Sequence, residues 1–159
     1  MSTWAPSQSL QSELERLDAL LLAGAATPDL LCSRAALAHA LGKLDEAKAG
    51  YLDVLRRDTN HVPALTRLSS LLHESGYRSA AITVYRRLIS LRPQSAAPHA
   101  GLGHVLWDHE DHEGARAEYE KALVLDPGCA QAHQGMAAVL HELRQPEEAL
   151  AHARQGYSG

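Results

Sequence analysis

The chain has 159 residues, which suits one domain and is long enough to bury a sizeable core. Its formal net charge of −4 argues against a nucleic-acid binder, because such a protein needs a basic surface. It contains no Phe and only 4% aromatic residues, and this scarcity, together with abundant Ala and Leu, favours helices throughout.

The cysteines and the N-terminal segment indicate the cellular compartment in which the protein is expected. Cys32 and Cys129 stand far apart and in no metal-ligand spacing, which favours a reducing environment. The first residues do not read as a secretory signal, because Glu13, Glu15 and Asp18 precede the short apolar run where positive charge would be required. No stretch reaches the length of a membrane-spanning helix. We therefore expect a cytoplasmic protein.

Nine helices are predicted in chain order. Residues 9–23 form the first, because Leu10, Leu14, Leu17 and Leu21 fall on one helix face. Residues 1–27 as a whole are expected to cap the helices that follow. Glycines that can adopt a left-handed conformation end some of the later helices, and prolines stop others. The predicted pairs are 29–41 with 44–57, 63–74 with 78–91, 96–109 with 112–125, and 130–142 with 146–155.

The helix pairs repeat with a period of 34 residues. An alanine position and, four residues later, a tyrosine position recur at this spacing: Ala47, Ala81, Ala115 and Ala149, then Tyr51, Tyr85 and Tyr119. The alanine position needs a small side chain where two helices cross closely. The tyrosines lie on the same helix face and are expected to fill the gap towards the neighbouring unit.

This pattern resembles the tetratricopeptide repeat, whose period is also 34. Leu102-Gly103, Ala115, Tyr119 and Pro127 match its signature positions, and the resemblance covers residues 28–155. The family's Trp position departs from the pattern and holds Leu31, Leu65, His99 and His133. The resemblance implies an all-α solenoid of stacked helix–turn–helix repeats that form a right-handed superhelical arc. The implied repeats are 28–61, 62–95, 96–129 and 130–155, followed by a tail at 156–159.

The resemblance also implies a concave groove that is lined by the first helix of each repeat and binds peptides. Its positions carry imidazole rings, one indole, one arginine and a rim of carboxylates: His39, Arg67, His73, Glu74, His104, Trp107, Asp108, His141 and Glu142. The neighbouring small residues, among them Gly101 and Gly135, are expected to leave room around Trp107, which makes it the expected anchor. The expected partner is a protein or peptide with basic and apolar residues, not nucleic acid or a membrane.

No catalytic residue, cofactor or metal ligand is assigned. Gly101-Leu102-Gly103 lacks the third glycine and the preceding strand of a phosphate-binding loop, so close helix packing explains it better. His39, His73 and His141 stand at the same position of the first, second and fourth repeats, and adjacent repeats lie roughly 10 Å apart, too far for all three to ligate one zinc ion. The sequence leaves open whether these histidines bind metal or sense pH.

The functional prediction is a protein–protein interaction scaffold that is not an enzyme. The alternative is the N-terminal substrate-docking arm of a larger bacterial-type enzyme, such as a transferase, whose catalytic domain lies beyond residue 159. Three interpretations fit the lack of a polar closing helix after Gln155. The chain is an excerpt of a longer protein, it self-associates through an open C-terminal face, or its last helix tolerates exposure.

The polar segment 107–114 raises the question of a hidden active site. The repeat frame divides it, since Trp107 and Asp108 belong to the groove and the residues after them form a turn. Glu110 occupies the position that Gly42 and Gly76 hold in other repeats, so a left-handed conformation there would cost roughly 1 kcal/mol. Asp111 is expected to cap the next helix.

Overall fold

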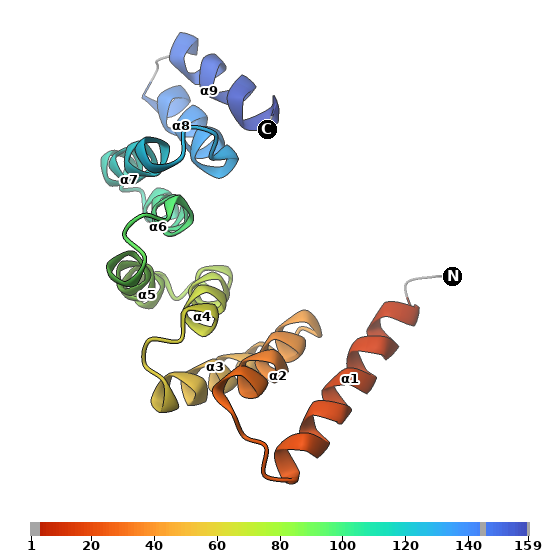
Figure 1. Ribbon diagram of the computed structural model, residues 1–159. Coiled ribbons are helices and arrows are strands. Elements are labelled where there is room, and N and C mark those ends of the chain that lie inside the picture. Colours follow the sequence, from red (N-terminus) through yellow and green to blue (C-terminus); the bar gives the residue numbers. More distant parts are fainter. Residues whose placement is uncertain (1–3, 144–145, 159) are drawn as a thin grey trace. The chain divides into compact units, whose positions relative to one another are not determined.

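The computed structural model describes residues 4–143 and 146–158, which form nine helices and no strand (Figure 1). The first helix, α1, spans Trp4–Leu22. Four helix pairs follow: α2 (Pro28–Ala40) with α3 (Leu44–Arg57), α4 (Val62–Glu74) with α5 (Arg78–Leu91), α6 (Ala96–Asp108) with α7 (His112–Leu125), and α8 (Ala130–Glu142) with α9 (Pro146–Ser158). The predicted all-α arrangement of helix–turn–helix repeats is confirmed. None of the described helices is both long enough and apolar enough to cross a membrane.

Both terminal helices are longer than the sequence predicts. α1 begins at Trp4 rather than at residue 9, and Pro6 sits in its first turn, where proline is tolerated because the N–H groups there have no partner within the helix. α9 continues to Ser158, through the segment predicted as a tail. Gly156 is buried there, and a Cβ at its position would lie 2.9 Å from Gln134 Cγ of α8. Packing on α8 therefore keeps helical a segment whose glycine disfavours a helix.

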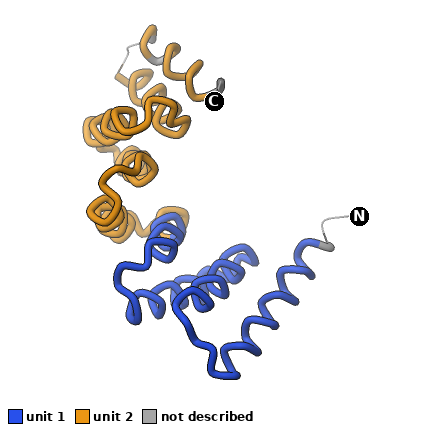
Figure 2. The backbone as a smooth tube through the Cα atoms, viewed as in Figure 1, with its two compact units in different colours: residues 1–71 blue, residues 72–159 orange. Residues whose placement is uncertain are grey.

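The chain divides into two compact units, residues 1–71 and residues 72–159, with the boundary inside α4 (Figure 2). In the first unit α2 packs against α3 and α1 packs against α2. Leu14 and Leu17, two leucines of the apolar stripe predicted on α1, are buried. A Cβ at Gly50 of α3 would lie 2.8 Å from the Cβ of Ala35, so these two helices cross with no room for a larger side chain.

The core of the second unit is built around tyrosine rings that lie over glycines. Tyr119 of α7 is 1% exposed, and a Cβ at Gly103 of α6 would come within 2.5 Å of its ring. A Cβ at Gly135 of α8 would also collide with the Tyr119 ring, as one at Gly101 would with Tyr85. The prediction that the tyrosines fill the gap between successive repeats is confirmed at these positions. The expectation that Gly101 and Gly135 leave room around Trp107 is wrong, because the tyrosine rings occupy that space.

The small alanine position is confirmed in the repeats whose side chains are described. Ala47, Ala81 and Ala115 have no exposed surface, while the side chain of Ala149 lies outside the described residues. Their methyl groups sit inside a helix pair, where a larger residue would push the helices apart.

The turns inside the repeats have the backbone that the sequence predicts. Gly42 and Gly76 adopt φ values of 77° and 80°, and Glu110 adopts 63°, the only positive φ of a non-glycine residue in the described part of the chain. Asp111 caps α7 as expected, since its Oδ1 accepts a hydrogen bond from the Gly114 N–H at 2.9 Å. The apparent site at 107–114 is therefore in part a strained helix–turn–helix corner.

Replacing Glu110 with glycine should stabilise the protein by about 1 kcal/mol, because glycine adopts this left-handed conformation without steric cost. Urea unfolding followed by circular dichroism measures the change. Gly42→Glu is the matched control, which introduces the same residue at the same turn position and should lower stability by a similar amount. A Glu110→Gly protein less stable than the wild type would contradict this account.

Gly135→Ala should destabilise the second unit by about 1–3 kcal/mol, since the added methyl group overpacks the contact with the Tyr119 ring. Gly128→Ala adds the same methyl group where the nearest atom, Asp126 Oδ1, lies 3.5 Å away, and should be close to neutral. Thermal unfolding of the two variants separates the clash from the general effect of a methyl group. Equal stabilities would show that the ring can move aside at little cost.

Candidate functional site

The first unit contains a groove of about 690 Å³ between α1, α2 and the start of α4. The predicted groove residue Arg67 lines it, together with Cys32, Ser33 and Ala36 of α2. Leu17 of α1 and Leu30 of α2 add apolar surface. The predicted groove residue His39 is half-buried and is not among the lining residues. It lies on α2, two residues after Leu37, which is the last residue of that helix to line the groove.

The charges of this groove are distributed unevenly. Arg16 is engaged by Glu13, with 2.7 Å between guanidinium nitrogen and carboxylate oxygen, whereas Arg67 is exposed at the surface. Burial raises the pKa of the Cys32 thiol, with Arg67 acting in the opposite direction, so this cysteine stays a neutral packing residue at neutral pH.

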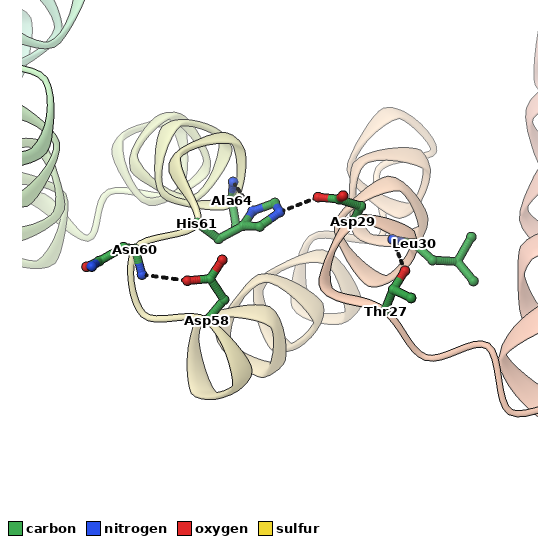
Figure 3. A network of polar contacts seen from close by, with 7 residues as sticks. All are labelled: Thr27, Asp29, Leu30, Asp58, Asn60, His61 and Ala64. Atoms are coloured by element: carbon green, nitrogen blue, oxygen red, sulfur yellow. Dashed lines mark hydrogen bonds and ion pairs between the residues drawn. The ribbon is translucent and has the colours of Figure 1, made fainter.

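A histidine that the sequence analysis did not single out joins two helices at the edge of this groove (Figure 3). Nδ1 of His61 accepts a hydrogen bond from the Ala64 N–H at 3.2 Å and thereby caps α4. Because Nδ1 accepts, the ring proton of neutral His61 lies on Nε2, which is 2.7 Å from Oδ1 of Asp29 in the first turn of α2. Helix-capping signatures in sequence rest on Ser, Thr, Asp and Asn, so they do not detect this histidine.

In the second unit the predicted residues at the ends of α4 and α6 meet. Nε2 of His73 lies 2.5 Å from Oδ2 of Asp108, although the two residues are one repeat apart in sequence. This pair places an imidazole and a carboxylate from successive repeats side by side at a partly exposed surface. The contact is an ion pair when His73 is protonated and a hydrogen bond from a neutral imidazole to the carboxylate otherwise.

His104 makes its polar contact with the core rather than with another predicted site residue. Its Nδ1 lies 2.7 Å from the hydroxyl oxygen of Tyr119. Burial raises the pKa of Tyr119, so the phenol stays protonated and donates this hydrogen bond. Burial, together with the nearby His73, lowers the pKa of His104, with Asp108 opposing the shift. A neutral His104 therefore presents Nε2–H as a donor.

Trp107 is more covered than the sequence suggests. Its ring centroid lies 4.4 Å from that of His112, and the indole packs partly buried against the cluster that includes Tyr119 and Met136. The small residues near Trp107 in the repeat frame predicted open space around this ring. The structure instead gives Trp107 a packing role in the α6–α7–α8 core, and its role as an anchor for a partner stays a prediction.

The remaining predicted residues lie at the C-terminal ends of first helices. Glu74, Asp108 and Glu142, one on each of α4, α6 and α8, are all exposed, and His141 beside Glu142 is exposed as well. His39 and Arg67 belong to residues 1–71, and the other predicted groove residues belong to residues 72–159. Among the described residues no group of three or more His, Cys, Asp and Glu side chains is arranged to hold a metal ion.

Two more histidines, at the position where the repeat family has Trp, are buried inside repeats. His99 of α6 is 2.7 Å from Oε2 of Glu118 on α7, and Lys121 donates to the other carboxylate oxygen at 3.0 Å. Burial acts to raise the pKa of Glu118, but the hydrogen bonds from His99 and Lys121 outweigh it and hold the pKa below its usual value. His133 of α8 pairs with His152 of α9. In the sequence, the only signal of these two pairs is a histidine at a repeat position that is otherwise apolar.

Known proteins share these features. Residues 62–95 and 98–129 each match the family model of the tetratricopeptide repeat. The two middle helix pairs are therefore similar to tetratricopeptide repeats. The first helix pair, α2 with α3, has a buried Ala47 and a buried Tyr51 at the same 34-residue spacing from those of the matched repeats.

Two named relatives illustrate where such repeats occur. The DnaJ homolog subfamily C member 7 homolog of Schizosaccharomyces pombe is 27% identical over 124 residues, which cover 68% of this repeat protein and 26% of the relative. The human Protein O-mannosyl-transferase TMTC3 is 33% identical over 92 residues, which cover 57% of this chain and 10% of the relative. The repeats thus span only a small part of the named relatives that they match.

Solved structures share the fold at low sequence identity. A crystal structure of MamA aligns with a TM-score of 0.83 at 20% identity, and covers 99% of this chain and 94% of MamA. The MamA structure from Desulfovibrio magneticus RS-1 that begins at its residue 41 gives a TM-score of 0.85 at 21% identity, covering 94% and 85%. At these identities the comparison establishes that the chains have the same repeat fold.

The capping role of His61 predicts which substitutions at this position the protein tolerates. His61→Ala removes the acceptor of the Ala64 N–H and the contact with Asp29, and should cost about 1 kcal/mol or more in urea unfolding. His61→Asn keeps a side-chain acceptor at the cap position and should recover most of that loss. If the Asn variant is as unstable as the Ala variant, the contact with Asp29, and not the cap, stabilises this corner.

Proposed function

We propose that this repeat protein is a protein-interaction scaffold, not an enzyme, and that a partner segment binds along the first helices of its repeats. The observation that supports it most directly is the row of exposed carboxylates at the ends of α4, α6 and α8, namely Glu74, Asp108 and Glu142. Each follows a histidine or a tryptophan in sequence, so the second, third and fourth repeats each offer a charged group beside a ring. Such a surface suits a segment with spaced side chains rather than one small molecule.

The proposed partner carries Lys or Arg together with an apolar residue. The carboxylates would contact the cations, and the accessible part of Trp107 would contact the apolar group, because aromatic side chains contribute most of the binding energy at many interfaces. The groove of the first unit, with its leucines and Arg67, is a separate candidate surface for a partner segment. The free thiols of Cys32 and Cys129 support the cytoplasm as the proposed location.

Selection of peptides from a random display library on the full chain tests this proposal without a known partner. The selected peptides should be enriched in Lys or Arg with nearby apolar residues. Trp107→Ala and Glu142→Gln should each weaken binding of the synthesised peptides about tenfold or more, as measured by fluorescence anisotropy. Glu120→Gln on α7 removes an equal charge from a second helix, and should leave affinity unchanged.

The salt dependence of binding provides an independent check. Affinity that rests on exposed carboxylates should fall as ionic strength rises, because salt screens charges that are separated by more than about 10 Å of solvent. Peptides that bind Trp107→Ala and Glu142→Gln as tightly as the wild type would refute binding along this surface.

A second candidate is that the repeats form the substrate-docking arm of a larger enzyme. The observation in its favour is the match to a segment of the human O-mannosyl-transferase, of which this chain spans 10%. The coding sequence beyond residue 159 tests it. A catalytic domain in the same reading frame would support this candidate, and a stop codon directly after residue 159 would exclude it.

A further inference from the structure

One position pair recurs where the two helices of a repeat face each other. In the third repeat it holds His99 on α6 and Glu118 on α7, and 34 residues later it holds His133 on α8 and His152 on α9. In the sequence the corresponding positions of the first two repeats hold Leu31 with Gly50 and Leu65 with Val84. The fourth repeat thus has two histidines, which both become positively charged in acid, at positions where the first and second repeats have no titratable side chain.

The geometry of the fourth pair restricts how many protons it can hold. The two Nδ1 atoms of His133 and His152 lie 2.8 Å apart, and Nε2 of His133 lies 2.7 Å from the carbonyl oxygen of Pro127. A carbonyl oxygen only accepts, so Nε2 of His133 carries a proton in every state of this arrangement. The bond between the rings then needs one proton shared by the two Nδ1 atoms.

Three protonation states can be compared. With both rings neutral, Nδ1 of His152 donates to Nδ1 of His133. With one ring protonated, a single proton still lies between the two Nδ1 atoms, and the bond becomes charge-assisted. With both rings protonated, two N–H groups point at each other and two positive charges lie within hydrogen-bonding distance. His133 is 7% exposed, so water screens this repulsion poorly.

The charged groups around the pair do not cancel this repulsion. Glu148, one turn before His152 on α9, favours its protonation, and Arg116 of α7 acts on Glu148 in turn. Burial and the neighbouring His133 prevail, so the pKa of His152 lies below its usual value. A histidine with a lowered pKa contributes stability that is present above the ordinary pKa of about 6.5 and is lost as pH falls.

We propose that the His133–His152 pair makes the packing of α9 on α8 acid-sensitive, so that α9 leaves α8 when both rings are protonated while the third repeat stays folded. The two repeats respond differently because their pairs differ. In the third repeat a protonated His99 faces the carboxylate of Glu118, which attracts it, and this pair persists until the carboxylate itself takes up a proton. At this pair of positions, mild acid therefore acts on the fourth repeat and not on the third.

Release of α9 would uncover the face of α8 against which it packs. A Cβ at Gly156 would touch Gln134 Cγ and the backbone of Ala130, so α9 lies directly on the N-terminal half of α8. The device would thus change the surface of the last repeat with pH, independently of whether a peptide binds elsewhere on the chain.

Hydrogen exchange of the full chain at about pH 7.5 and about pH 5 tests the proposal, with protection factors used so that the intrinsic pH dependence of exchange cancels. The amides of α9 should lose about tenfold or more of their protection at the lower pH, while those of α6 and α7 keep theirs. Equal protection of α9 at the two pH values would overturn the proposal.

The chain itself supplies matched variants. His133→Leu with His152→Val installs the residues of the second repeat and should make the protection of α9 the same at both pH values. His152→Glu installs the pair of the third repeat and should keep α9 protected at about pH 5, because a protonated His133 would then face a carboxylate. A double variant that loses α9 protection in acid as the wild type does would assign the effect to other groups and overturn the proposal.

A titration of the wild-type histidines by NMR does not depend on how well the variants fold. The ring resonances of His152 should titrate below the ordinary histidine pKa, and this step should coincide with the loss of α9 protection. A titration of His152 near the ordinary value, with no change in α9, would refute the proposal.

Discussion

The close approach of helices is the constraint on which the rest of this structure depends. With no phenylalanine in the chain, the space between helices is filled by tyrosine rings that need glycine opposite them and by alanines at the helix crossings. The Tyr119 ring occupies the volume that side chains at Gly103 and Gly135 would take, and Tyr85 does the same at Gly101. Because each tyrosine lies on one repeat and each partner glycine at Gly101 or Gly135 lies on the next, the same contact both closes a repeat and attaches its neighbour.

This packing also determines which polar groups face the first helices. Tyr119 presents its hydroxyl to His104, so an imidazole that the repeat frame assigns to a groove position is fixed by a hydrogen bond from the core. Trp107 is likewise partly held against the α6–α7–α8 cluster. The carboxylates at the ends of α4, α6 and α8 are exposed, and this is why the proposed partner is described by its charge rather than by a deep pocket.

The buried histidines show how a repeat position can change chemistry without changing the fold. An apolar pair, a histidine with a glutamate, and two histidines occupy equivalent sequence positions along the chain. Each polar pair satisfies its own hydrogen bonds, as His133 does through the Pro127 carbonyl and the His152 ring. Repeats with the same backbone therefore differ in their response to protons, because the stability of a polar pair depends on charge while that of an apolar pair does not.

The sequence by itself determined the helix pairs, the 34-residue period, the left-handed turns at Gly42, Gly76 and Glu110, and the cap at Asp111. These features follow from local propensity and from spacing along one helix, so residues near in sequence specify them. Only the tertiary structure decided which rings lie over Gly101 and Gly135, that His61 caps α4 and reaches Asp29, and that His133 meets His152. Those contacts join residues on different helices, and their partners depend on side-chain direction and close packing, which periodicity in one dimension does not contain.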